Sequence, residues 1–183
     1  MNQTNYVILG LLSEGPMTGY DIKRFIDIRF RFFWSESYGQ IYPSLRALCG
    51  EGYIGEAEAG EGTPRAKRVY RLLPRGMEVL RAWLARPVGK ETVRLEILLR
   101  MYFSHLTEPE VMLAHVREFR RAHARDLATL RLFEKELKAI EEEDAAHPSI
   151  LRVIDFGLKA NEAYLDWCAE TEKYLEGRLG YEA

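Results

Sequence analysis

The feature that most constrains the fold of this chain is a change of hydrophobic period at Gly52. Before it, apolar residues recur every three or four positions, which is the spacing of a helix face. After it, residues 53–58 and 67–72 have the pattern of two strands, and the second contains Val69 and Tyr70. The segment between them is rich in glycine and proline, which favour turns. This arrangement predicts a two-stranded β-hairpin.

Three short helices are expected before this hairpin. The first covers residues 2–13 and ends at Gly15 and Pro16, since both residue types interrupt helices. Thr18 is suited to begin the second helix as its N-cap, and Asp21 follows three residues later, where a carboxylate favours the helix start.

The third helix is expected to begin at Ser37, because Gln40 follows at the spacing of a capping box. Its inner face consists of Ile41, Leu45 and Leu48. Three helices followed by a two-stranded wing predict a winged helix-turn-helix, a fold that binds DNA.

A domain boundary is expected soon after the wing. Pro74 is placed to occupy the first position of a fourth helix, which Pro favours. Residues 87–89 are Pro-Val-Gly, a combination typical of linkers. We therefore expect a winged helix-turn-helix DNA-binding domain over residues 1–86 and a helical dimerisation domain over residues 87–183.

The second domain has only helical patterns. A short helix is expected over residues 92–105, and Thr107 with Glu110 predicts a capping box for a long helix that ends near Glu143. A second long helix is expected over residues 148–179, after a break at a proline. The fold class is thus mainly α with a small β-wing.

The two long helices predict an antiparallel hairpin. At ~30 residues each, they would be about 45 Å long. Their apolar stripes are wider than one hairpin can bury against itself. We therefore expect a homodimer formed through the C-terminal helices.

Charge is distributed unevenly along the chain. Residues 1–86 carry 12 basic and 9 acidic side chains, a net charge of +3, whereas residues 87–183 carry a net charge of −5. A mildly basic first half is consistent with a surface that meets phosphate.

No basic n-region opens the chain and no apolar run could span a bilayer, so we expect a cytoplasmic protein. Cys49 and Cys168 are expected to be buried or half-buried thiols rather than a disulfide.

The residues expected to contact DNA lie on the helix-turn-helix and on the wing. A recognition helix places its N-terminal residues near base edges, where Gln suits adenine and Arg suits guanine, although Gln40 has the alternative of capping its own helix. Basic residues of the wing are expected to contact phosphate, the alternative being a solvated loop beside nearby glutamates. The expected DNA-binding residues are Tyr20, Lys23, Ser37, Tyr38, Gln40, Tyr42, Ser44, Arg46, Arg65, Lys67 and Arg68.

The sequence contains no motif typical of a catalytic or metal site. GxSxG, P-loop and dinucleotide-binding patterns are missing, as is HExxH. His115 and His123 are eight residues apart on a predicted helix, but no carboxylate or cysteine completes a ligand set. We expect no enzymatic activity, no cofactor and no bound metal.

Aromatic residues near the domain junction and on the long helices are candidates for binding a small hydrophobic effector. The alternative is that they belong to the core or to the dimer interface. The candidate residues are Trp83, Tyr102, Phe103, Phe119 and Trp167.

Five motifs of the first domain together resemble one family. They are residues 8–12 (Ile-Leu-Gly-Leu-Leu), 18–22 (Thr-Gly-Tyr-Asp-Ile), 40–45 (Gln-Ile-Tyr-Pro-Ser-Leu), 52–54 (Gly-Tyr-Ile) and 70–72 (Tyr-Arg-Leu). In this order they resemble PadR-type transcriptional regulators. The remainder is similar to the helical C-terminal domain of the longer branch of that family, the branch that includes a virulence activator.

This resemblance implies a dimeric winged-helix repressor or activator on a palindromic operator, and some members respond to phenolic acids or hydrophobic drugs. One position departs from the family pattern, because Leu73 stands where a Thr usually precedes the helix after the wing. Leu is a poor N-cap. The alternative function is a winged helix that binds only protein, which predicts no salt-dependent affinity for DNA.

Overall fold

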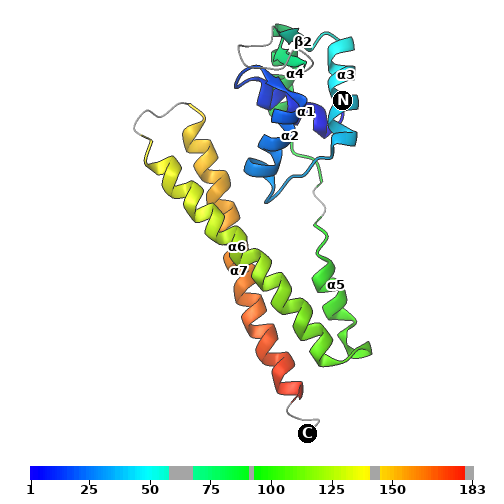
Figure 1. The fold of residues 1–183 in the computed structure, drawn as a ribbon, viewed down its shortest axis with the longest axis vertical. Coiled ribbons are helices and arrows are strands. Elements are labelled where there is room, and N and C mark those ends of the chain that lie inside the picture. The colour runs from blue at the N-terminus through cyan, green and yellow to red at the C-terminus, as the bar shows by residue number, and fades with distance from the viewer. Residues whose placement is uncertain (58–67, 91–92, 141–144, 180–183) are drawn as a thin grey trace. The chain divides into compact units, whose positions relative to one another are not determined.

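A computed structural model describes residues 1–57, 68–90, 93–140 and 145–179. The chain divides into two compact units, residues 1–90 and 91–183. The division follows Lys90, close to the expected domain boundary after residue 86. The expected fold class is confirmed, since the described residues are mainly helical with one small antiparallel sheet (Figure 1).

The helices of the N-terminal unit begin at the positions expected from their caps. The Thr18 side chain accepts a hydrogen bond from the Asp21 N–H at 3.1 Å, and the Asp21 carboxylate accepts one from the Thr18 N–H at 3.1 Å. This reciprocal pair satisfies two donors that a helix start leaves open. The elements are α1 (Gln3–Leu12), α2 (Gly19–Phe25), a π-helical turn η1 (Ile26–Phe30), α3 (Tyr38–Gly50) and α4 (Pro74–Leu84).

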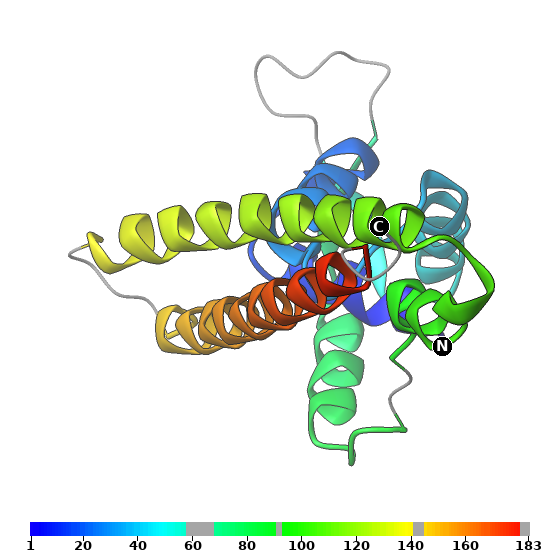
Figure 2. The same ribbon diagram turned by 90° about the horizontal axis from the view of Figure 1, so that it is seen from below.

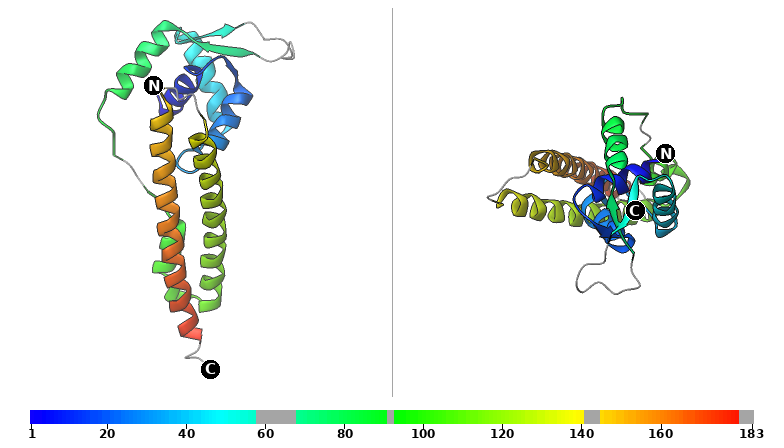
Figure 3. Two further views of the ribbon diagram at one scale, coloured as in Figure 1. Left: turned by 90° about the vertical axis from the view of Figure 1, so that its left-hand side faces the viewer. Right: turned by 90° about the horizontal axis from the view of Figure 1, so that it is seen from above.

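The sheet of this unit has three strands rather than the expected two. Strands β2 (Ile54–Ala57) and β3 (Val69–Leu72) pair antiparallel as predicted, and the left view of Figure 3 shows them side by side. A third strand, β1 (Met17–Thr18), pairs with the other edge of β3, so that the order is β1-β3-β2. The additional strand attaches the start of α2 directly to the wing.

One core holds the N-terminal unit together. The inner face of α3 is buried as predicted, and it packs against α1, α2 and the sheet. The completely buried side chains of this core include Ile8, Leu9, Ile22, Ile26, Ile41 and Leu45. Trp83 of α4 stacks on Tyr6 of α1 with ring centroids 4.7 Å apart and remains 37% exposed.

The C-terminal unit is a long helical hairpin with a short helix beside it. Its elements are α5 (Glu96–Tyr102), a 3-10 turn η2 (Ser104–Leu106), α6 (Pro109–Lys138) and α7 (His147–Leu179). Figures 1 and 2 show α6 and α7 running antiparallel along their whole length. None of the helices among the described residues combines the length and the hydropathy that a membrane span requires.

The interface between α6 and α7 contains polar as well as apolar groups. Val116 and Leu175 are completely buried there. Asn161 is buried too, and its Oδ1 lies 2.7 Å from Nδ1 of His123. The Nε of Arg120 lies 3.0 Å from a carboxylate oxygen of the buried Glu172. Buried polar groups that find hydrogen-bond or ion-pair partners help to specify one packing arrangement, because an unpaired buried polar group is costly.

Three expectations about the C-terminal unit are wrong. The first helix begins at Glu96 rather than at residue 92, and Ile97 is its buried residue. The capping box of Thr107 does not form, because Glu108 is the N-cap and Pro109 takes the first helical position without a side-chain cap. The helix then ends at Lys138, before residue 143.

Candidate nucleic-acid interface

The start of α3 is fixed by a capping interaction between Ser37 and Gln40. The Gln40 Oε1 accepts hydrogen bonds from the Ser37 N–H at 2.8 Å and from the Ser37 hydroxyl at 2.9 Å. A bidentate contact with adenine needs this amide oxygen as well as the NH₂ group. In the free protein the oxygen is therefore already in use, while the NH₂ group keeps its donors.

The outer face of α3 carries most of the residues expected to face DNA. Tyr38 and Tyr42 are 44% and 42% exposed, and Arg46 is exposed as well. The rings of Tyr38 and Tyr42 stack with their centroids 6.0 Å apart and their planes inclined by 20°. Because the opposite face of α3 is held in the core, this side is the one that a ligand can approach.

Ser44 corrects the expectation. It was expected to point outward, but only 5% of it is exposed. Ser44 follows Ile41 by three residues and precedes Leu48 by four, and residues at these spacings share one side of a helix. It therefore belongs to the buried face and cannot reach a base from this position.

The two candidate residues of α2 have different surroundings. Tyr20 is exposed. The Lys23 ammonium forms an ion pair with the carboxylate of Asp27 and lies 5.7 Å from the centroid of the Tyr38 ring. Its side chain is only 17% exposed. The charge of Lys23 is thus partly neutralised within the protein, and its position is coupled to that of Tyr38.

A hollow of about 490 Å³ lies where α2, α3 and β3 meet. Two cations, Arg46 of α3 and Arg68 beside β3, contribute to its wall together with phenol rings. Burial raises the pKa of Tyr70, so this hydroxyl stays protonated and able to donate a hydrogen bond. The residues that line the hollow are Thr18, Gly19, Tyr20, Tyr42, Arg46, Arg68 and Tyr70.

The wing is only partly described. Arg68 lies at its base, where its Nη1 is 3.2 Å from the Glu56 carboxylate on the neighbouring strand, and both side chains are largely exposed. Arg65 and Lys67 lie outside the described residues. Glu56, one of the glutamates near the wing, thus pairs with Arg68, one of the three expected cations.

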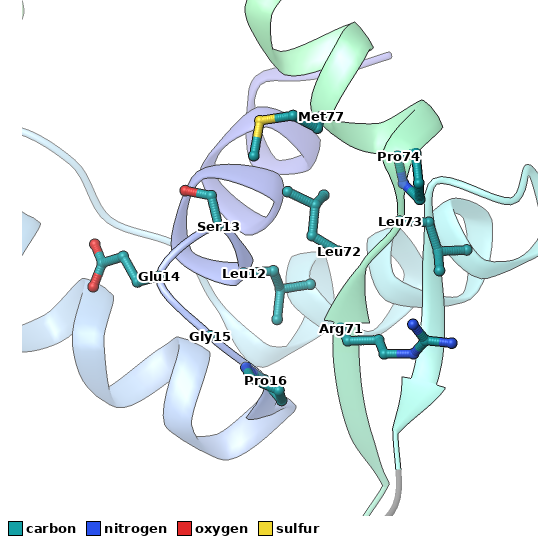
Figure 4. Close-up of a pocket in the computed structure, with 10 residues that line it drawn as sticks. All are labelled: Leu12, Ser13, Glu14, Gly15, Pro16, Arg71, Leu72, Leu73, Pro74 and Met77. Carbon is teal, nitrogen blue, oxygen red and sulfur yellow. The ribbon is translucent and has the colours of Figure 1, made fainter.

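A second hollow, also of about 490 Å³, lies on another side of the same unit, between the end of α1, β3 and the start of α4. Figure 4 shows Leu12, Leu72 and Met77 directed toward one another, while the guanidinium of Arg71 extends away from them. Alternate residues of a strand point to opposite faces, which explains why Leu72 and Arg71 diverge. Glu14, which also lines this hollow, forms an ion pair with Arg29. The hollow thus presents mainly apolar side chains.

The residues proposed for effector binding fall into three groups. Trp83 packs in the N-terminal unit. Phe119 and Trp167 make an edge-to-face contact with centroids 6.2 Å apart, and both pack against the core of the C-terminal unit. Tyr102 and Phe103 contact each other and are 78% and 49% exposed. Within the C-terminal unit the structure thus places four of the candidates in two pairs.

The histidines of the hairpin have partners other than a metal ligand set. His123 faces Asn161, and His115 Nε2 lies 3.3 Å from a guanidinium nitrogen of Arg100. Among the described residues, no group of three or more His, Cys, Asp or Glu is placed to hold a metal ion. Cys49 and Cys168 are free thiols, the first partly buried and the second buried, as expected.

Sequence reasoning did not assign three of the residues that line this hollow to DNA binding, namely Thr18, Gly19 and Tyr70. Gly19 lines the hollow, and its contact with Tyr42 joins the two helices of the helix-turn-helix. In the sequence Gly19 stands within the motif of residues 18–22, but nothing in that pattern says that its missing side chain makes room for Tyr42.

Comparison with known proteins identifies two family segments. The model of the transcriptional regulator PadR-like family matches residues 8–82, and that of the virulence activator alpha C-terminal domain matches residues 93–176. The negative transcriptional regulator PadR of Bacillus subtilis is 40% identical over 105 residues. This match covers 56% of the chain and 57% of that curated relative.

Solved structures match over nearly the whole length. A PadR-like transcriptional regulator from Bacillus cereus has a TM-score of 0.79 at 26% identity, with 96% of this chain and 99% of that chain covered. Bacillus subtilis PadR in complex with operator DNA has a TM-score of 0.77 at 28% identity, with 93% and 98% covered. The same PadR in complex with p-coumaric acid has a TM-score of 0.72 at 26% identity, with 96% and 98% covered.

Proposed function

Because the chain belongs to the PadR-like family of transcriptional regulators and carries a virulence-activator-like C-terminal domain, we propose that it is a cytoplasmic, sequence-specific DNA-binding repressor. It acts as a homodimer on a palindromic operator and is released from DNA by a hydrophobic or phenolic small molecule. The sign of regulation follows that of the Bacillus subtilis relative, which is a negative regulator.

The observation that carries the proposal is the hollow between α2, α3 and β3. It brings together Arg46 and Arg68 with Tyr20 and Tyr42, from separate elements of the helix-turn-helix and wing. Arginine and tyrosine are among the residue types that bind phosphates of the DNA backbone, so a concave surface lined by them is suited to a phosphate. A similar PadR has been solved with operator DNA, which supports this use of the surface.

Base reading is assigned to the exposed side of α3, with the wing as a second contact. Tyr38, Tyr42 and Arg46 present aromatic and cationic groups to the major groove. Ser37 and Gln40 stand at the helix start, where Gln40 either reads a base with its NH₂ group or only maintains the cap. The wing contacts phosphate through Arg65, Lys67 and Arg68, and Tyr20 and Lys23 of α2 contact the DNA backbone.

Exposed apolar side chains of the C-terminal unit support the dimer. Leu99, Tyr102 and Leu106 are each more than half exposed, and so is Phe156 on α7. A monomer seldom leaves this many large apolar residues in water without a partner. A two-fold axis also suits the charge, since a front half of only +3 gains phosphate contacts when two copies bind together.

We assign the effector-binding site to the candidate aromatic residues, and a phenolic acid is the leading class of ligand. A similar PadR has been solved with p-coumaric acid. Tyr102 and Phe103 have the exposure that a ligand contact needs, Trp83 is also exposed, and Phe119 and Trp167 are half-buried. Because Phe119 and Trp167 pack against the core, the exposed pair is the stronger candidate.

The test uses the full-length protein and duplexes enriched by it from a random DNA pool. We expect the enriched sites to have two-fold symmetry. The triple variant Arg65→Ala, Lys67→Ala, Arg68→Ala should bind more weakly, and the slope of log affinity against log salt should fall by roughly 0.9 for each lost phosphate contact. The matched control replaces the α4 and α5 arginines Arg75, Arg81 and Arg100 with Ala, which removes the same charge.

Five outcomes would each contradict part of the proposal. No enriched duplex, or affinity that does not depend on salt, would favour a winged helix that binds only protein. Equal affinity of the wing variant and its control would remove the wing from the interface. A mass in solution equal to one chain would exclude the homodimer, and sites without symmetry would exclude the palindromic operator.

A further inference from the structure

Gly19, the first residue of α2, lies directly against the ring of Tyr42 on α3. A Cβ atom added to Gly19 would lie 2.8 Å from Cε1 and 3.2 Å from Cζ of that ring. Carbon atoms at van der Waals contact are about 3.5–4.0 Å apart. The backbone of Gly19 does not have a positive φ, so the glycine is needed for space and not for backbone conformation. The ring can occupy its position only because residue 19 has no side chain.

Tyr42 is the first member of a row of contacts across the outer side of the helix-turn-helix. Its ring stacks on that of Tyr38, one turn earlier in α3. The Tyr38 ring in turn lies below the ammonium group of Lys23, at 5.7 Å from the centroid, which returns the row to α2. We call Tyr42, Tyr38 and Lys23 the tyrosine row. It joins α2 to α3 on the side opposite the apolar core, and Gly19 supports one of its ends.

We propose that Gly19 is a positioning residue for DNA recognition, which acts by seating the Tyr42 ring against α2. This proposal rests on the proposed function, since it assigns a role within the same DNA-binding surface. With the ring seated, the Tyr42 side chain forms part of the wall of the hollow that also holds Arg46 and Arg68. A methyl group at residue 19 pushes the ring outward, into the space that DNA occupies, and separates it from Tyr38.

The same geometry predicts that this change affects DNA binding more than folding. The nearest atoms belong to Tyr42, which is exposed on its outer side and can turn away. The other close atom is Cδ1 of Leu45 at 3.2 Å, which needs a shift of only a few tenths of an ångström. Alanine is also a better helix former than glycine, which partly offsets this crowding.

The experiment is a double-mutant cycle on the full-length protein. Affinity for the duplex enriched by the wild type is measured by fluorescence anisotropy for Gly19→Ala, Tyr42→Ala and the variant with both changes. Gly10→Ala is the matched control, because Gly10 is a helical glycine whose added Cβ would meet nothing within 4 Å. Thermal unfolding is followed for all variants.

We expect Gly19→Ala to weaken binding about tenfold in the presence of Tyr42, and less than about twofold in the Tyr42→Ala background. Gly10→Ala should bind like the wild type. Equal losses in both backgrounds, or no loss with Tyr42 present, would overturn the proposal. If Gly19→Ala lowers the melting temperature, the double variant must recover that temperature, because the closest atoms, those of the Tyr42 ring, are gone. A failure to recover would locate the clash at Leu45 and would also overturn the proposal. A wild type that enriches no duplex contradicts the proposed function instead.

Discussion

The backbone carbonyl of Tyr53 lies over the α-carbon of Gly76, so close that a Cβ atom on Gly76 would be 2.2 Å from the carbonyl oxygen. The carbonyl is held there because it accepts a hydrogen bond from the Leu73 N–H at 3.0 Å. Unlike a surface side chain, this backbone cannot turn away. The contact therefore sets the distance at which α4 packs on the turn before β2.

Gly76→Ala is expected to be strongly destabilising. The added methyl group forces α4 away from the sheet, and overpacking of this kind costs roughly 1–3 kcal/mol or more. The control Gly10→Ala should be neutral or slightly stabilising, because it gains helix propensity without a contact. Urea unfolding followed by circular dichroism measures both. Equal stability of the two variants would mean that α4 does not approach the backbone this closely.

Local interactions are the part of this fold that the sequence predicts best. The pair Thr18 and Asp21 and the pair Ser37 and Gln40 form as expected, because a cap needs only residues three positions apart. Pro74 occupies the first position of α4 for the same local reason. Leu73 indeed caps this helix without a side-chain hydrogen bond.

Long-range interactions explain what the sequence could not predict. Strand β1 has two residues and exists only because Met17 and Thr18 meet Tyr70 and Val69 across the sheet. Ser44 is small enough to be tolerated at the edge of an apolar face. Its polar side chain therefore wrongly predicts that it is exposed. In the candidate site, the exposure of the tyrosines follows from the helix period. The ion pair of Lys23 with Asp27 is likewise local, since the two residues are four positions apart, whereas the pair of Arg68 with Glu56 depends on the pairing of β2 with β3.

Glu56→Gln is expected to strengthen DNA binding. The Glu56 carboxylate pairs with Arg68 at 3.2 Å, but an ion pair between such exposed side chains contributes little stability. Removing its charge frees Arg68 and removes a repulsion from phosphate, so affinity for the enriched duplex should rise about two- to fivefold at low salt, and the gain should shrink as salt increases. Glu78→Gln on α4 makes the same change of charge outside the proposed interface. A loss of affinity for Glu56→Gln would mean that the pair orients Arg68 for DNA rather than competing with it.

The fully buried thiol of Cys168 is expected to make stability fall at alkaline pH. Burial raises the pKa of this thiol above its usual 9.0, and the Glu172 carboxylate raises it further. The unfolded chain therefore releases the proton first as the pH rises, and the stability that the thiol contributes below pH 9 is lost as the pH rises toward the folded-state pKa. Urea unfolding under reducing conditions at pH 7 and pH 10 measures this fall. Cys168→Ala should flatten it by at most about 1.4 kcal/mol per pH unit, and an unchanged pH dependence would assign it to other groups.

Asn161 is expected to be the polar residue on which the helical hairpin depends most. Its Nδ2 donates a hydrogen bond to the Gly157 carbonyl at 2.7 Å, so its Oδ1 is left to accept one from Nδ1–H of His123. Asn161→Ala leaves that half-buried N–H without its acceptor and should cost about 1–3 kcal/mol in the free energy of unfolding. The neighbouring Glu162→Ala removes only an exposed ion pair with Arg131 and should cost less than about 1 kcal/mol. If Glu162→Ala proved the more destabilising of the two in urea unfolding, the buried amide would not be what holds α6 and α7 in register.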